Sequence, residues 1–146
     1  MHESVAVAPL ALRHAVEEQS GRYPDDGEVL DRLLAFLETK RPMMREIRDS
    51  VCEFYGLEPG ELDSRSRFAD VSFSRQMFCF LAYKHTRFSM QQIGWQVGVR
   101  NHTTVLHAIR KIERWVIFRP LVADDVDLLR MRISEKVLLR WSQGRG

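Results

Sequence analysis

The sequence lacks the features of membrane-spanning, exported and disulfide-stabilised proteins. No apolar run approaches the roughly 20 residues that a membrane-spanning helix needs, since the longest nearly apolar stretch, residues 5–12, is short and contains Pro9. No Lys or Arg precedes that stretch, as it would in a secretory signal. The only two cysteines, Cys52 and Cys79, lie in apolar helical patterns, where a free thiol usually behaves as a small buried hydrophobe. We therefore expect a cytoplasmic protein with no disulfide and no membrane partner.

The patterns that catalysis, metals and nucleotides require are also missing. The sequence contains no Gly-x-x-x-x-Gly-Lys-Ser/Thr phosphate loop. His102 and His107 are five positions apart, about 140° around a helix, so they cannot share a metal ion as an i, i+4 pair does. Cys79 and His85 have no second pair at zinc-ligand spacing. These absences predict that the chain is not an enzyme and uses no cofactor, metal ion or nucleotide.

Acidic residues are scarce in the middle of the chain. Residues 64–119 contain 10 basic and 2 acidic residues, whereas residues 1–63 contain 7 basic and 14 acidic ones. A basic block of this kind is typical of a surface that binds a polyanion, although solvated surface charge also explains it. The block offers no carboxylate cluster for metal-dependent nuclease chemistry.

Apolar residues recur at helical spacing almost throughout, which predicts an all-α fold. We expect Phe78, Phe80 and Tyr83 to belong to the core rather than to stack on bases. Gly56 should end its helix in the left-handed conformation, and a polar connection follows it over residues 57–72. The expected helices cover residues 27–39, about 47–55, 74 to about 86, a short stretch after Ser89, 102 to about 118, and about 125–141.

Two of these helices form a recognisable motif. Ser89, with Gln92 three residues later, is a capping box for the short helix, which Gly98 ends. Asn101 then caps a longer helix, and Pro120 ends it. A short helix, a three-residue turn with glycine and a longer helix are typical of a helix-turn-helix.

The longer helix has two different faces. Its core-facing stripe consists of Val105, Ala108, Ile109, Ile112 and Val116. The opposite stripe carries hydroxyl, imidazole and guanidinium groups without an acid, from Thr103, His107, Arg110 and Arg114. Such a face can contact a duplex through base edges and phosphates, although a basic outer stripe is also typical of a simply solvated helix.

The residues across this motif resemble a known family. Residues 93–112, IGWQVGVRNHTTVLHAIRKI, are similar to the signature of the C-terminal DNA-binding domain of the bacterial replication initiator DnaA. Upstream, the run SRQM at residues 74–77 resembles the family's Pro-Arg-Gln-Met, and the similarity extends over about residues 44–118. The resemblance implies a Trp-repressor-like helix-turn-helix bundle that recognises a short duplex site of the DnaA-box type. We expect it here with an extra N-terminal helix and without the ATPase domain.

The resemblance also implies which residues contact DNA. It places Asn101, His102 and Thr103 at base edges in the major groove, Met90 near a thymine methyl, Arg67 in the minor groove, and Arg75, Gln76, Arg100, Thr104 and His107 near phosphates. Arg110 and Lys111, further along the recognition helix, complete the predicted set.

The sequence departs from the family pattern at two places. Asn101 stands where the family usually has Asp, which suits the amino group of cytosine, whereas an asparagine can pair with adenine. The loop over residues 64–74 has fewer arginines than the family's basic loop. Fewer phosphate contacts predict weaker binding and a shallower dependence of affinity on salt.

These patterns give an expected organisation and two functional hypotheses. The expected parts are an N-terminal arm (1–26), a helix and linker (27–42), the helix-turn-helix domain (43–142) and a tail (143–146). The first hypothesis is a nucleoid-associated, sequence-specific binder of double-stranded DNA that acts as a replication-related or transcriptional regulator. The alternative is a protein-interaction module that has kept the fold but lost specific DNA binding. Such a module would hold a partner through the acidic N-terminal segment or the C-terminal helix.

Overall fold

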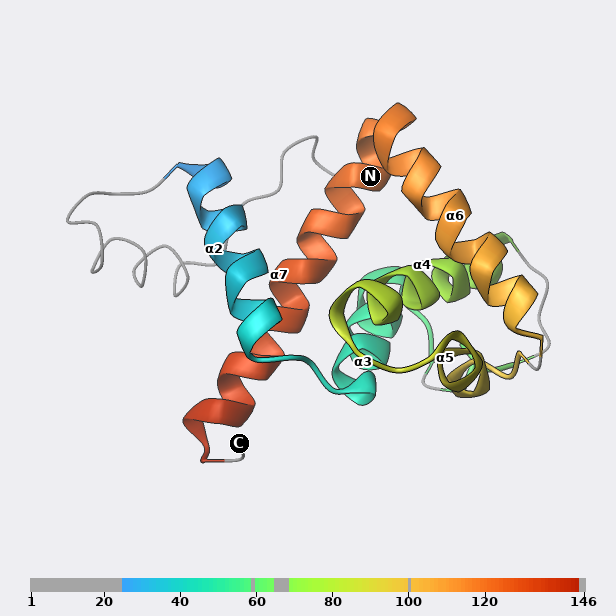
Figure 1. Ribbon diagram of the computed structural model, residues 1–146, viewed down its shortest axis with the longest axis horizontal. Coiled ribbons are helices and arrows are strands. Elements are labelled where there is room, and N and C mark those ends of the chain that lie inside the picture. The colour runs from blue at the N-terminus through green and yellow to red at the C-terminus, as the bar shows by residue number, and fades with distance from the viewer. Residues whose placement is uncertain (1–24, 59, 65–68, 100, 145–146) are drawn as a thin grey trace.

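The computed structural model describes residues 25–144 except 59, 65–68 and 100. This part of the chain is built from helices alone, without a strand, which confirms the predicted all-α class (Figure 1). The predicted arm lies outside the described residues except for its last two, and Asp26 already belongs to the first helix. The helices are α2 (Asp26–Thr39), α3 (Met44–Tyr55), α4 (Ala69–His85), α5 (Met90–Gln96), α6 (His102–Phe118) and α7 (Pro120–Ser142).

Local chemistry explains where most of these helices begin and end. The Asp25 side chain caps α2 by accepting a hydrogen bond from the backbone N–H of Glu28 at 2.8 Å. Gly56 ends α3 with φ = 69°, the left-handed conformation that its position predicts. The helices predicted at 27–39, 47–55 and 102–118 are therefore confirmed.

The predicted start of α4 at Ser74 is wrong, because the helix begins at Ala69. The polar stretch preceding Ser74 contains Val71, whose side chain is buried, and Asp70, whose charge suits the first turn of a helix. Ser74 lies inside the helix, where its hydroxyl donates a hydrogen bond to the carbonyl of Asp70 at 2.7 Å. The predicted connection over residues 57–72 is correspondingly shorter.

The predicted start of the last helix near residue 125 is also wrong. Pro120 ends α6 as expected but is itself the first residue of α7. Its fixed φ suits a first helical position, where the missing N–H costs nothing. Asp124 and Asp125 therefore lie beyond the first turn rather than near the N-terminus of the helix.

The core forms around α4, which packs on α3, α5 and α6. Phe78 and Phe80 are buried as predicted, but Tyr83 is 43% exposed, so its assignment to the core was wrong. A tyrosine tolerates this position because its hydroxyl can remain in water. Cys52 and Cys79 are buried free thiols, as predicted. Burial raises the pKa of Cys79 to about 12, which keeps its thiol protonated and unreactive.

The long helix α7 joins the extra N-terminal helix to the rest of the molecule. Figure 1 shows α2 lying beside α7, and α7 also packs on α3 and α6. The inner face of α2 buries Val29, Leu33 and Leu37. The N-terminal helix is thus part of the packed structure.

A buried ion pair connects α7 to the start of α3. Arg140 donates two hydrogen bonds to the Glu46 carboxylate, from Nε to Oε2 at 2.9 Å and from Nη2 to Oε1 at 3.1 Å. The side chains are only 9% and 8% exposed, respectively. Arg140 also donates to the carbonyl of Arg41 at 3.2 Å, and Glu46 accepts from the N–H of Met43 at 2.7 Å. Arg140 lies in the last turn of α7, where a positive charge suits the helix dipole, and Glu46 gives it a buried partner as well.

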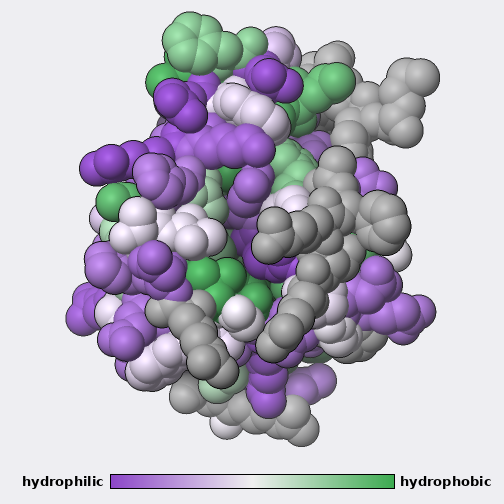
Figure 2. Space-filling view, turned by 90° about the vertical axis from the view of Figure 1, so that its right-hand side faces the viewer, coloured by the Kyte–Doolittle hydropathy of each residue, from purple (hydrophilic) through white to green (hydrophobic). Residues whose placement is uncertain are grey.

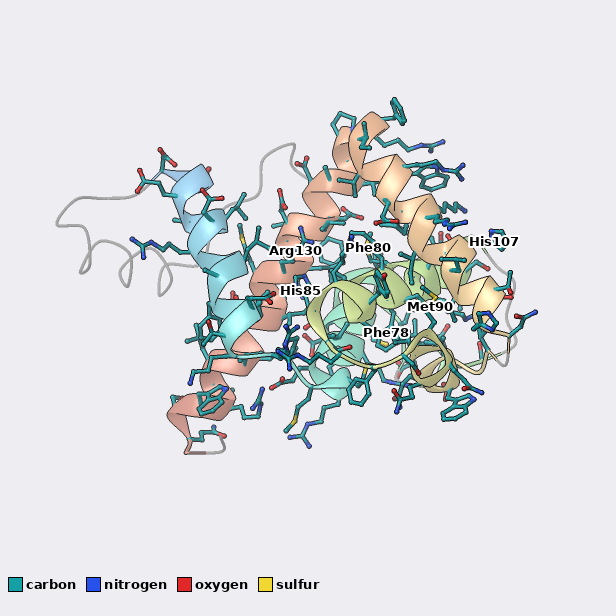
Figure 3. All side chains as sticks on the ribbon, in the orientation of Figure 1. Phe78, Phe80, His85, Met90, His107 and Arg130 are labelled. Atoms are coloured by element: carbon teal, nitrogen blue, oxygen red, sulfur yellow. The ribbon has the colours of Figure 1, made fainter. Side chains whose placement is uncertain are left out.

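A second polar contact, partly buried, lies between α4 and α7. Arg130 donates from Nε to Nε2 of His85 at 3.0 Å, beside the ring of Phe80 (Figure 3). Burial, followed by the charges of Arg130, Arg41 and Lys84, lowers the pKa of His85 from 6.5 to about 4. His85 is therefore a neutral acceptor in the folded protein at neutral pH.

Acidification is expected to destabilise the protein through His85. Its folded pKa of about 4 lies below the ordinary value of 6.5, so the unfolded chain binds a proton first as the pH falls. The stabilisation is fully present above pH 6.5 and declines by at most about 1.4 kcal/mol per pH unit down to pH 4. Urea unfolding at several pH values measures this slope. His85→Gln keeps an acceptor for Arg130 without the titration and should flatten the slope; an unchanged slope in that variant would contradict the assignment.

Candidate nucleic-acid interface

The α5–turn–α6 unit folds as its capping residues predict. The Ser89 hydroxyl accepts from the N–H of Gln92 at 3.2 Å, and the Gln92 side chain accepts from the N–H of Ser89 at 2.9 Å. Gly98 has φ = 71°, which turns the chain between the helices. The predicted capping box and the glycine turn are both confirmed.

Gly94 allows α5 and α6 to approach closely. A Cβ atom at this position would lie 2.7 Å from the carbonyl oxygen of Val99 and 3.0 Å from Cγ2 of Val105. Ordinary van der Waals contacts need more room than this, so any larger residue must push the two helices apart. Gly94 therefore lets the turn and α6 lie closely against α5.

The two faces of α6 are those the sequence predicts. Val105, Ala108, Ile109 and Ile112 are buried, and Val116 is partly buried against them. Thr103, His107, Arg110 and Arg114 are all exposed. Figure 3 shows His107 on the outer side of the helix, away from the core. The molecule therefore presents a continuous polar and basic stripe to solvent along α6.

The N-terminal end of α6 gathers several of the predicted site residues. Asn101 caps the helix, its Oδ1 accepting from the N–H of Thr103 at 2.9 Å. The side chains of His102, Thr103 and Thr104 are exposed beside it. Lys111, two turns further along, is half-buried, with its Nζ 4.4 Å from the centre of the Trp115 ring. Asn101, His102, Thr103 and Thr104 thus form a cluster that is open to solvent.

Arg75 binds the protein's own backbone. Its Nε donates to the carbonyl of Leu62 at 3.0 Å and its Nη2 to the carbonyl of Ser64 at 2.8 Å. These two carbonyls immediately precede residues 65–68. Arg75, which the resemblance places near a phosphate, therefore also holds the backbone of residues 62–64, the loop entry, against α4.

The backbone at Asp63, between the carbonyls that Arg75 binds, also packs on the helix-turn-helix. A Cβ atom at Gly98 would lie 2.9 Å from the carbonyl oxygen of Asp63, so the turn packs directly on this backbone. Arg48 of α3 donates to the carbonyl of Gln96 and lies 3.9 Å from the Asp63 carboxylate. Sequence reasoning missed Arg48, because its partner is 48 positions away and no local spacing signals the contact.

Gln76 lies in a hollow between α4 and α6. Its Oε1 is buried and has no hydrogen-bond partner among the described residues. The hollow has a volume of about 310 Å³, and Arg75, Gln76 and Thr104 line it together with Val99 and Val105. Figure 2 faces this side of the molecule and shows hydrophilic side chains around a small apolar depression. Three predicted phosphate contacts therefore border a single depression.

The remaining predicted residues have separate positions. Met90 begins α5 and is partly buried against the core (Figure 3). Arg67 and Arg100 lie outside the described residues. Within the described part, no group of three or more His, Cys, Asp or Glu could hold a metal ion. None of the helices described is long and apolar enough to cross a membrane.

Comparison with known proteins gives a consistent set of matches. The family described as "Bacterial dnaA protein helix-turn-helix" matches residues 44–112. The chromosomal replication initiator protein DnaA of Bartonella quintana (strain Toulouse) is 38% identical over 113 residues, covering 75% of this chain and 23% of that protein. The DnaA protein of Rhodopseudomonas palustris (strain BisB18) is 39% identical over 98 residues, covering 67% of this chain and 21% of the relative. The DnaA protein of Jannaschia sp. (strain CCS1) is 35% identical over 95 residues, covering 65% and 20%. The matched region thus spans only about a fifth of these relatives.

Proposed function

Because the chain belongs, through residues 44–112, to the bacterial DnaA helix-turn-helix family, we propose that it binds double-stranded DNA sequence-specifically through α6. The site is of the DnaA-box type, and binding serves replication or its regulation, including transcriptional control at such sites. The matched domain is a DNA-binding module and not a catalytic one. The observation that carries the proposal is the exposed stripe of α6, where Thr103, His107, Arg110 and Arg114 follow one another without an acidic side chain.

The N-terminal end of α6 and the arginines further along the helix are expected to make different kinds of contact with DNA. Asn101, His102 and Thr103 stand at the helix end that a helix-turn-helix directs toward base edges. Arg110 and Arg114 lie two to three turns further along, where guanidinium groups neutralise phosphates and release counterions. Base contacts supply sequence preference, whereas phosphate contacts supply affinity that falls with salt.

The proposal is tested by fluorescence anisotropy. The binding of a DnaA-box duplex is compared with that of a scrambled duplex of equal length, each at two salt concentrations. We expect tighter binding to the box and weaker binding to both duplexes at the higher salt concentration. Thr103→Ala should reduce affinity for the box by about tenfold and leave the scrambled duplex nearly unaffected. Arg110→Ala should weaken both duplexes similarly and reduce the salt slope by about one.

The matched control is Arg132→Ala, which removes the same charge from an exposed position on α7. It should leave binding to both duplexes within about twofold of the unmodified protein, since surface charges outside an interface contribute little. Equal affinity for both duplexes would reduce the function to nonspecific DNA attachment. No binding at either salt concentration would instead favour the protein-interaction module.

A further inference from the structure

The orientation of the Asn101 side chain limits what it can offer to a base. Its Oδ1 accepts the N–H of Thr103 at 2.9 Å, in the capping position of α6. Only the oxygen of an amide can accept from an N–H, so the cap itself determines which end of the amide faces the helix. The Nδ2 group, with two hydrogens and no acceptor capacity, is left for a partner outside the protein.

An aspartate at the same position would behave in the opposite way. One of its two oxygens would cap the helix and the other would remain free as an acceptor. In the major groove, an acceptor matches the amino groups of cytosine and adenine, whereas a donor matches N7 and O6 of guanine, O4 of thymine or N7 of adenine. The exchange of Asp for Asn therefore reverses the direction of the hydrogen bond while leaving the cap in place.

We propose that Asn101 is a specificity-determining residue that donates to a base acceptor, with guanine preferred and thymine second, at the position where an aspartate would select cytosine. This inference rests on the proposed function of α6. Guanine presents two acceptors side by side, which the two amide hydrogens can share while Oδ1 continues to cap the helix.

The two-bond adenine pairing that an asparagine can make in general is disfavoured here, and a single bond from Nδ2 to adenine N7 would place Nδ2 beside adenine's own amino donor. The two-bond pairing requires Oδ1 and Nδ2 to face the base edge together, and Oδ1 of Asn101 is turned to the N–H of Thr103. Forming the adenine pair would break the helix cap, at a cost of about fivefold in affinity. Guanine and thymine carry no such cost.

The test is a complete single-substitution scan of the DnaA-box duplex by fluorescence anisotropy, for the unmodified protein and for Asn101→Asp. At one base position we expect the unmodified protein to prefer guanine or thymine over cytosine by about tenfold. Asn101→Asp should reverse that preference toward cytosine at the same position and leave the other positions unchanged. Asn101→Ser, which caps the helix without an outward amide, should lose the preference at that position alone.

The outcomes separate this inference from the proposed function. The deciding position is the one at which Asn101→Asp changes the base preference. If the unmodified protein prefers cytosine or adenine there, the role of Asn101 is overturned and sequence-specific binding remains intact. A box preference that Asn101→Asp does not alter overturns it as well. Salt-dependent binding with no preference at any position, or no binding at all, overturns the proposed function together with the inference. Circular dichroism of each variant establishes that α6 is still folded.

Discussion

Replacing Arg140 with methionine is expected to lower the free energy of unfolding by about 3–5 kcal/mol. The Glu46 carboxylate is 8% exposed and receives two hydrogen bonds from Arg140, so the variant leaves a buried negative charge without its cation. Restoring water to the carboxylate would require α7 to separate from the start of α3. Urea unfolding followed by circular dichroism measures the loss.

Lys136→Met is the matched control, because it removes the same charge from the same helix. Lys136 forms its ion pair with Glu53 at 3.0 Å, but those side chains are 29% and 52% exposed. An exposed pair of this kind contributes at most about 1 kcal/mol. Similar losses in the two variants would contradict the distinction between them. Glu46→Gln combined with Arg140→Met should recover part of the stability, since the buried charge is then absent.

Gly94→Ala is expected to abolish sequence-specific DNA binding, with a loss of more than tenfold for the box duplex. The added Cβ would lie 2.7 Å from the carbonyl oxygen of Val99 in the turn and 3.0 Å from Cγ2 of Val105 in α6, so we expect the turn and α6 to shift relative to α5. Overpacking of this kind also lowers the free energy of unfolding by about 1–3 kcal/mol. Anisotropy and urea unfolding measure the two effects.

Gly60→Ala provides the comparison for this experiment. A Cβ atom at Gly60 meets nothing within 4 Å, so the same chemical change creates no overlap there. We expect its stability and DNA binding to remain close to those of the unmodified protein. If Gly94→Ala bound the box duplex as tightly as Gly60→Ala, the close approach of the two helices would not control the presentation of α6.

Sequence reasoning succeeded where the chemistry is local. Ser89 with Gln92, Asn101 with Thr103, and the left-handed glycines all act within three residues, so spacing alone reveals them. The two faces of α6 follow from helical periodicity in the same way. These features were sufficient to locate the helix-turn-helix and the exposed stripe that carries the proposed function.

Sequence reasoning failed where partners are distant in the chain and where one residue suits two helix boundaries. Arg75 was expected only near a phosphate, and its bonds to Leu62 and Ser64 depend on the path of a loop that no periodicity describes. The sequence predicts Pro120 only as the end of one helix, although a proline equally suits the beginning of the next. The buried partner of Arg140 is 94 positions away, and nothing in the spacing links the two residues.

That separation between Glu46 and Arg140 has a consequence for synthesis on the ribosome. Translation adds about 5–20 residues per second, so the 94 residues between the two side chains require roughly 5–20 s. Throughout this interval a nascent α3 carries a carboxylate whose cation has not yet been made, and its first turn has to remain in water. The translation of α7, which follows that of α3, therefore determines when the first turn of α3 can be buried. A chain that ends before Arg140 lacks this contact, and we expect the first turn of its α3 to stay exposed to proteases.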